Sequence, residues 1–244
     1  MPKGSRLARA GGLAFAACAV LPALNGCGLL GSASTSEAPG PAATTAAAKS
    51  YTVTAPVALV VINGGAGKIT VTGSTRSTVA VTEQPYYSNS TKPPTSRHTV
   101  SGSTLTLSYS CQTQITCGVG YDVQVPRGLT VRVSDREGAI TLTGLAGPVS
   151  AQTIAGVITA TRLSSPSASF KSTAGAITVA CTAAPATLTA TTTAGPITLT
   201  VPRSAIYKVN AHTVIGHATV TVRQSASARS VITASSDLGG ITIT

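Results

Sequence analysis

A short unit, Gly-x-Ile-Thr, recurs along the chain and limits the folds that the chain can adopt. From Gly138 onward, the unit glycines are separated by 18, 19, 20, 21 and 23 residues. A period near twenty residues is typical of stacked repeats, each of which buries its apolar face only against its neighbours. In a strand, the Ile and the next apolar residue share one face and the Thr residues share the other. The units begin at Gly67, Gly138, Gly156, Gly175, Gly195, Gly216 (where Ala replaces Ile) and Gly239.

A second, weaker strand pattern lies between successive units. These segments cover residues 148–153, 168–173, 187–191 and 207–211. Two strands in each repeat predict an all-β fold, a parallel β-solenoid built from rungs of about twenty residues.

The portion from residue 51 to about 133 is less regular. Apolar alternation and turn residues predict strands there, separated by signals such as Gly64-Gly65 and Gly102-Ser103, and a polar loop over 86–97. We expect this portion to cap the solenoid or to continue it with longer excursions. The predicted strands are 57–62, 69–72, 78–82, 99–100, 104–108, 121–125 and 130–133.

The order of these elements resembles a bacterial family of β-strand-repeat domains of unknown function, the putative-adhesin family. The similarity covers most of residues 51–244. It includes the strand that follows Gly102, the run Tyr121-Asp-Val-Gln-Val-Pro-Arg-Gly-Leu129, the serial Gly-x-Ile units and a second Val201-Pro-Arg203. The resemblance implies a role in surface interaction and names no ligand or catalytic residue. Many relatives carry Asp after the repeat glycine, whereas this chain does not, so an acidic or cation-binding ladder is not expected.

The N-terminal segment has the features of a bacterial lipoprotein signal. Basic residues at Lys3, Arg6 and Arg9 precede an apolar stretch over 13–24 that is too short to span a membrane. Leu-Asn-Gly-Cys27 then resembles a lipobox, in which the Cys27 thiol receives a diacylglyceryl group. We expect a signal peptide at 1–26, a lipidated Cys27 with a flexible tether at 27–50, and one domain at 51–244. The chain is then exported and anchored to the outer face of the cytoplasmic membrane.

The net charge and the composition argue against several function classes. The chain has 17 basic and 6 acidic residues, and removal of the signal leaves 14 basic residues that form no cluster. Since nucleic-acid-binding proteins concentrate basic residues on one element, no nucleic-acid partner is expected. Only 3% of residues are aromatic and no Trp occurs, which argues against stacking platforms for single strands.

The cysteines fit an exported protein. Cys18 leaves with the signal and Cys27 takes the lipid, so that three remain in the domain. Cys111 and Cys117 flank a short segment, and we expect a disulfide that staples a hairpin end. Cys181 follows the inward alternation of its strand and is expected to be a buried free thiol.

The side chains that support catalysis or metal binding are sparse. His98, His212 and His217 are the only imidazoles, and a zinc pair from the last two is disfavoured against solvated surface residues. Asp135 and Glu137, with Asp122 upstream, form a small acidic group in a turn, where such residues are ordinary. We therefore expect no enzyme activity, no cofactor and no metal.

Thr-x-Thr pairs recur in the repeats and predict two outward rows if the rungs stack in register. A flat Thr array resembles the ice-binding face of unrelated β-solenoid antifreeze proteins, while solvated strands also favour Thr. The predicted rows contain Thr70, Thr72, Thr141, Thr143, Thr159, Thr161, Thr198, Thr200, Thr219, Thr221, Thr242 and Thr244.

Four functions remain open from the sequence. The favoured one is a non-enzymatic, lipid-anchored surface module for adhesion or envelope interaction, with wall polymer, glycan or envelope protein as its partner. The second is a structural or accessory envelope component without a ligand of its own. A carbohydrate-active enzyme and an ice-binding Thr array are the remaining alternatives.

Overall fold

The computed structural model describes residues 43–88, 92–112 and 117–244, which belong to one compact unit. The predicted signal peptide, Cys27 and most of the predicted tether lie outside the described residues. Within the described residues every regular element is a β-strand, as the sequence predicts, and the strands form two sheets. No helix in this part of the chain is long and apolar enough to cross a membrane.

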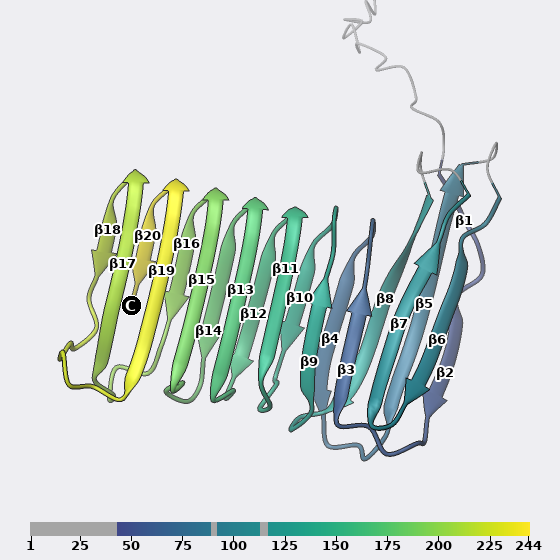
Figure 1. Cartoon of the computed structure of the whole chain (residues 1–244), viewed down its shortest axis with the longest axis horizontal. Helices are drawn as coiled ribbons and strands as arrows, with labels where there is room; N and C mark the ends of the chain where they lie inside the picture. The colour runs from purple at the N-terminus through teal and green to yellow at the C-terminus, as the bar shows by residue number, and fades with distance from the viewer. Residues whose placement is uncertain (1–42, 89–91, 113–116) are drawn as a thin grey trace, which may run out of the picture. The chain divides into compact units, whose positions relative to one another are not determined.

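One sheet, here called sheet A, has 11 strands and contains every Gly-x-Ile-Thr strand (Figure 1). Its strands follow in the order β18 (Ala218–Val220), β20 (Ile241–Ile243), β16 (Ile197–Thr200), β14 (Ile177–Cys181), β12 (Ile158–Leu163), β10 (Ile140–Thr143), β4 (Ile69–Ser74), β8 (Cys117–Pro126) and β5 (Val79–Ser88), with β1 (Ala43–Thr45) and β2 (Lys49–Val53) both paired to β5.

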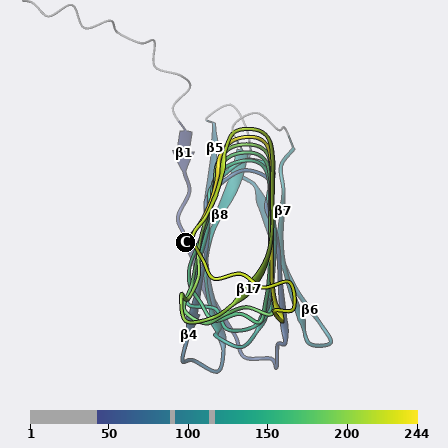
Figure 2. The ribbon, with the colours of Figure 1, turned by 90° about the vertical axis from the view of Figure 1, so that its left-hand side faces the viewer.

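The second sheet, sheet B, has nine strands and lies opposite sheet A (Figure 2). From Gly138 onward the chain alternates between the sheets, so each repeat contributes one strand to each. Sheet B follows the order β17 (Tyr207–Ile215), β19 (Ser230–Leu238), β15 (Thr187–Ala194), β13 (Ser167–Ala174), β11 (Val149–Ala155), β9 (Thr130–Ser134), β3 (Leu59–Asn63), β7 (Thr104–Ser110) and β6 (Thr95–Ser101).

Pairing in the repeat region is parallel, as predicted. Antiparallel pairs occur where β5 meets β1, β2 and β8, and where β6 meets β7. The predicted loop over 86–97 is wrong at both ends, because β5 extends to Ser88 and β6 begins at Thr95. Strands also precede residue 51, since β1 covers Ala43–Thr45 and β2 begins at Lys49.

The order of strands departs from the order of the chain at both ends of the stack. The last repeat, β19 with β20, lies between the β15–β16 repeat and the β17–β18 repeat. At the other end, β7 and β8 lie between the β3–β4 pair and strands β5 and β6. In both places a later segment pairs inside an earlier one, so β17 and β18 lie at the outer edge of the stack although β19 and β20 follow them in the chain.

The core consists of small and branched side chains that alternate along each strand. In β10 the side chains of Ile140 and Leu142 are fully buried, while Thr141 between them is partly exposed. Phe170, Tyr121 and Tyr207 are the largest fully buried side chains in the described residues. The low aromatic content therefore reflects a narrow space between the sheets, which Val, Ile, Leu and Ala fill.

The repeat glycines lie at the turn from sheet B to sheet A, and backbone packing requires them there. Gly138 has a φ of 145° and Gly195 has a φ of 144°, values that favour glycine. A Cβ atom on Gly138 would overlap the carbonyl oxygen of Gly67, and one on Gly195 would overlap that of Gly175. The glycine at this position thus permits close contact between neighbouring turns.

The parallel pairing of β12 with β14 contains a change of register. Pairing runs from Ile158 to Ala160 and resumes between Leu163 and Cys181. Arg162 accommodates this irregularity with a φ of 53°, the only positive φ at a non-glycine residue in the described part of the chain. Cys181 is a free thiol, as predicted. It is half-buried and not buried as predicted, because the inward alternation stops before it.

Candidate functional site

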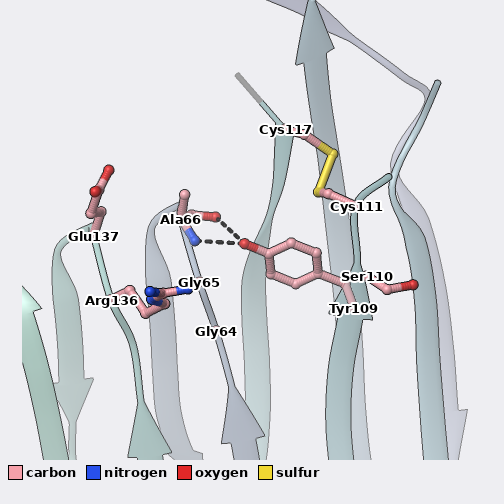
Figure 3. Close-up of a pocket in the computed structure, with 9 residues that line it drawn as sticks. All are labelled: Gly64, Gly65, Ala66, Tyr109, Ser110, Cys111, Cys117, Arg136 and Glu137. Atoms are coloured by element: carbon pink, nitrogen blue, oxygen red, sulfur yellow. Dashed lines mark hydrogen bonds between the residues drawn. A yellow bond between two sulfur atoms is a disulfide. The ribbon is translucent and has the colours of Figure 1, made fainter. Parts of the chain in front are cut away.

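A polar hollow of about 510 Å³ lies at the edge where sheet B strands turn into sheet A (Figure 3). It is formed by the turn between β3 and β4, the end of β7, the start of β8 and the turn between β9 and β10. Its lining residues are Gly64, Gly65, Ala66, Tyr109, Ser110, Cys111, Cys117, Arg136 and Glu137.

Tyr109 fixes one wall of the hollow. Its hydroxyl accepts a hydrogen bond from the Ala66 N–H at 2.6 Å and lies 3.4 Å from the Ala66 carbonyl oxygen, to which it donates (Figure 3). Burial raises the pKa of the Tyr109 hydroxyl above its ordinary value, and the hydroxyl is protonated at neutral pH. Gly65 leaves the space that the Tyr109 hydroxyl occupies, because a Cβ atom there would lie 2.5 Å from that oxygen.

A disulfide between Cys111 and Cys117 forms another wall (Figure 3). The sequence predicts that this bond staples a hairpin, and that part of the prediction is wrong. Strand β7 belongs to sheet B and β8 belongs to sheet A, so the two strands that flank the disulfide do not pair with each other. The bond instead ties one sheet to the other at the rim of the hollow.

Arg136 and Glu137 bring opposite charges to the hollow from the turn before Gly138. Both side chains are exposed, and the backbone between them is fixed on both sides. The backbone of Glu137 forms isolated parallel β-bridges with Ala66 on one side and Ala155 on the other. The Ala155 N–H also donates to the Arg136 carbonyl oxygen at 2.8 Å. A charged pair on a fixed turn, beside backbone amides and a tyrosine, can hydrogen-bond a polar ligand.

Asp135 lies beneath this turn and is 4% exposed. Its Oδ1 accepts a hydrogen bond from the Arg136 N–H at 3.0 Å, and its Oδ2 has no partner among the described residues. Burial raises the pKa of this carboxyl to about 6, while the Arg136 N–H opposes the shift and Glu137 adds to it. Asp135 thus belongs to the interior, whereas the sequence predicts an ordinary turn residue.

Asp135 occupies one position in a buried row of polar side chains. The equivalent residues in the following repeats are hydroxyls that point inward three residues before a repeat glycine. Four of these hydroxyls donate to the carbonyl oxygen of a repeat glycine on the adjacent rung at 2.8–3.3 Å. The donor and acceptor pairs are Ser172 with Gly156, Thr192 with Gly175, Ser236 with Gly195, and Thr213 with Gly239.

This row was not predicted, although its signal is visible in the sequence as Ser, Thr or Asp three residues before the repeat glycine. Thr153 belongs to the same row, and its hydroxyl has no partner among the described residues. At β9 and β11, next to the hollow, the row therefore lacks the hydrogen bond to a glycine carbonyl oxygen that its later members make.

Of the two predicted lines of Thr residues, the first lies in register on the outer face of sheet A. We call the first line the Thr row; it includes Thr178, which the prediction omitted. Consecutive members are Cα partners across parallel strands, at a spacing of about 4.8 Å. The Thr row is Thr70, Thr141, Thr159, Thr178, Thr198, Thr242 and Thr219.

The second predicted line of Thr residues is interrupted. Thr72, Thr143 and Thr161 pair in sequence, and the hydroxyls of Thr143 and Thr161 lie 3.3 Å apart. Ala180 then stands opposite Thr200, whose hydroxyl lies 3.5 Å from that of Thr244.

The other sequence candidates are dispersed. His98 on β6 stacks on Tyr51 of β2 with ring centroids 4.3 Å apart, which joins the two sheets at one end of the stack. His212 lies on the exposed side of β17, and His217 lies in the turn before β18. Asp122 is exposed on β8 and pairs in register with Thr70. The described residues contain no group of three His, Cys, Asp or Glu placed to hold a metal ion.

Comparisons with known proteins give similarities of structure at low identity. No family model and no curated protein matches the chain. A putative cell adhesion protein from Clostridium sporogenes ATCC 15579 is 12% identical, with a TM-score of 0.47 over 81% of this chain and 99% of that chain. A putative adhesin from Bacteroides fragilis NCTC 9343 is 15% identical, with a TM-score of 0.46 over 84% and 99%. A putative lipid binding protein from Parabacteroides distasonis ATCC 8503 is 10% identical, with a TM-score of 0.33 over 81% and 96%.

Proposed function

We propose that the chain is an exported, lipid-anchored β-solenoid module that contacts envelope components through the polar outer face of sheet A without catalysing a reaction. The observation that carries this proposal is the Thr row, which places one outward hydroxyl on each successive rung of sheet A. A repeated line of donors and acceptors suits an extended partner, such as a wall polymer, a glycan or a strand of an envelope protein.

Membrane attachment in this proposal rests on Cys27. Thioether-linked acyl chains and an acylated amine give stable anchoring, because each buried CH₂ contributes about 0.8 kcal/mol. The segment that follows is rich in Ala, Ser, Thr, Pro and Gly, and would hold the sheets away from the membrane surface.

Two comparisons test the anchor. Cells that express the full chain are grown with a labelled fatty-acid analogue, and membrane and soluble fractions are compared between the wild type and Cys27→Ser. The proposal expects label and membrane retention in the wild type and the loss of both in Cys27→Ser. Label in the variant, or no label in either protein, would contradict the anchor.

The contact surface is tested with the Cys27→Ser chain, which lacks the anchor. In this background, Thr159→Lys with Thr198→Lys places two cations on the Thr row. The matched control places Lys at Ser169 and Thr189, which lie in register on the outer face of sheet B. Co-sedimentation with isolated cell envelopes should decrease only for the Thr-row variant, and an equal decrease in both would overturn the assignment.

A further inference from the structure

The repeat stack ends differently at its two edges. At one end, Tyr51 stacks on His98 across the sheets, and antiparallel strands lie outermost. At the other end, β17 and β18 form the last rung (Figure 1). Within the described residues β17 pairs only with β19 along its length, apart from an isolated bridge between Tyr207 and Gln224. Strand β17 is therefore a nine-residue edge strand.

The free edge of β17 has a defined set of backbone groups. The Tyr207 N–H donates to the Arg223 carbonyl oxygen, and the Ser225 N–H donates to the Tyr207 carbonyl oxygen, both at 3.0 Å on the side away from β19. Backbone groups alternate sides along a strand, so those of Val209, Ala211 and Thr213 also face away from β19. These positions can pair with an added strand without loss of any bond to β19.

The interior is open at the same edge. Val209 and Ala211 are only partly buried, whereas their partners Ile232 and Ala234 on β19 are 0% exposed. At the tip of this rung Val214 is 66% exposed, and Ile215 is 64% exposed beside Leu238 at 51%. Because terminal repeats need a polar outer surface for solubility, we expect a binding partner to cover this apolar edge.

The charge of the side chains at this end of the stack indicates which kind of partner is complementary to it. Exposed basic side chains surround the last rungs, and Asp237 is the only acidic residue between Ala139 and Thr244. A second copy that docked the same edge would bring like charges together, which disfavours a symmetric dimer. An acidic strand is instead complementary. The exposed basic residues are Arg203, Lys208, Arg223 and Arg229.

We propose that the free edge of β17 binds an extended acidic segment of an envelope protein as an additional strand of sheet B. The alternation of β17 sets the sequence class of the partner. Apolar side chains pack over Val209 and Ala211, and Asp or Glu side chains between them face Lys208 on the outer side. This inference rests on the proposed interaction function and names a class of partner for it.

The test measures binding of a fluorescent peptide of alternating Glu and Val to the purified full chain by anisotropy. A Lys–Val peptide of equal length is the matched probe. The inference expects the Glu–Val peptide to bind, with affinity that falls as salt increases, and the Lys–Val peptide not to bind. Equal binding of both peptides, or no binding of either, would overturn it.

Two variants locate the site. Lys208→Glu reverses the outward charge, and Ala211→Pro removes an N–H that β19 does not use, a placement that edge strands tolerate. Each should weaken the Glu–Val peptide about tenfold or more, while Lys171→Glu on β13 should not. Circular dichroism checks that each variant folds, and Lys208→Glu alone still decides the question if Ala211→Pro does not.

Self-association is the alternative occupant. If the wild type dimerises in analytical ultracentrifugation and Ala211→Pro restores the monomer, a second copy covers the edge and the inference is wrong. Failure of peptide binding leaves the labelling of Cys27 and the contacts of the Thr row unaffected, so the two proposals fail separately.

Discussion

The hydroxyl of Ser236 donates a hydrogen bond to the carbonyl oxygen of Gly195 at 3.0 Å, although 41 residues separate them in the chain. The corresponding pair Ser172 and Gly156 is separated by only 16 residues. The longer separation arises because β19 and β20 insert between the β15–β16 and β17–β18 repeats. The hydrogen bond thus joins rungs that are adjacent in space and not consecutive in sequence.

Ser236→Ala should destabilise the protein. Ser236 is fully buried, and its removal leaves the Gly195 carbonyl oxygen without this donor, which costs about 1–3 kcal/mol of unfolding free energy. Chemical denaturation measures the change. Ser150→Ala on the exposed outer face of β11 is the matched control and should change the stability by less than about 0.5 kcal/mol.

Gly175→Ala should be more damaging. Gly175 has a φ of 151°, and an added Cβ would overlap the Gly156 carbonyl oxygen. The combined strain and overlap should cost roughly 3 kcal/mol or more, so a strongly lowered melting temperature or a failure to fold is expected. Gly128→Ala provides the comparison, since nothing lies within 4 Å of its added Cβ. Equal melting temperatures for the two variants would contradict the role assigned to the repeat glycines.

Asp135 should make stability fall as pH rises. Its pKa is about 6 in the folded protein, above the ordinary value of 3.8, so the folded state binds more protons between these values. The stabilisation is therefore fully present below about pH 4 and is lost as pH rises through 6, to a limit of about 3 kcal/mol. Denaturation of wild type and Asp135→Asn at a series of pH values measures it.

In Asp135→Asn this part of the pH dependence should disappear. Asp122→Asn, at an exposed position on β8, should retain it. A pH profile that Asp135→Asn leaves unchanged would show that another group titrates.

The disulfide should contribute about 2 kcal/mol, because it closes a loop between residues only six apart in sequence. Reductant should lower the unfolding free energy of the wild type by this amount, measured by chemical denaturation. The double variant Cys111→Ser with Cys117→Ser should start at the lower value and be insensitive to reductant. Sensitivity of the double variant would point to a different redox-active pair.

Much of the fold could be predicted from the sequence because apolar alternation and the glycine spacing report burial directly. Each Gly-x-Ile-Thr unit enters sheet A, and the pairing in the repeats is parallel. The strand at Ser230–Leu238 was not predicted, since its polar run Ser235-Ser236-Asp237 obscures the alternation. The insertion of β19 between β15 and β17 depends on three-dimensional pairing and has no local signal.

The candidate site was less predictable. Asp135 appeared to be an ordinary turn residue because its acidic neighbour Glu137 and the following Gly138 are typical of turns. Its burial depends on Gly64, which follows β3, a strand that pairs with β9 although the two are far apart in the chain. The missing side chain of Gly64 leaves room for the carboxylate. The hollow likewise combines four separate chain segments, which local patterns do not bring together.

The measurement that tests the proposed function most directly is site-specific photo-crosslinking in intact cells that produce the full, Cys27-containing chain. A photoreactive residue replaces Thr198 on the Thr row, and a matched one replaces buried Leu199 next to it. We expect the probe at Thr198 to form a covalent adduct with a wall polymer, glycan or envelope protein, and the probe at Leu199 to form none. The absence of any adduct at Thr198, with the protein labelled by fatty acid and folded, would contradict it.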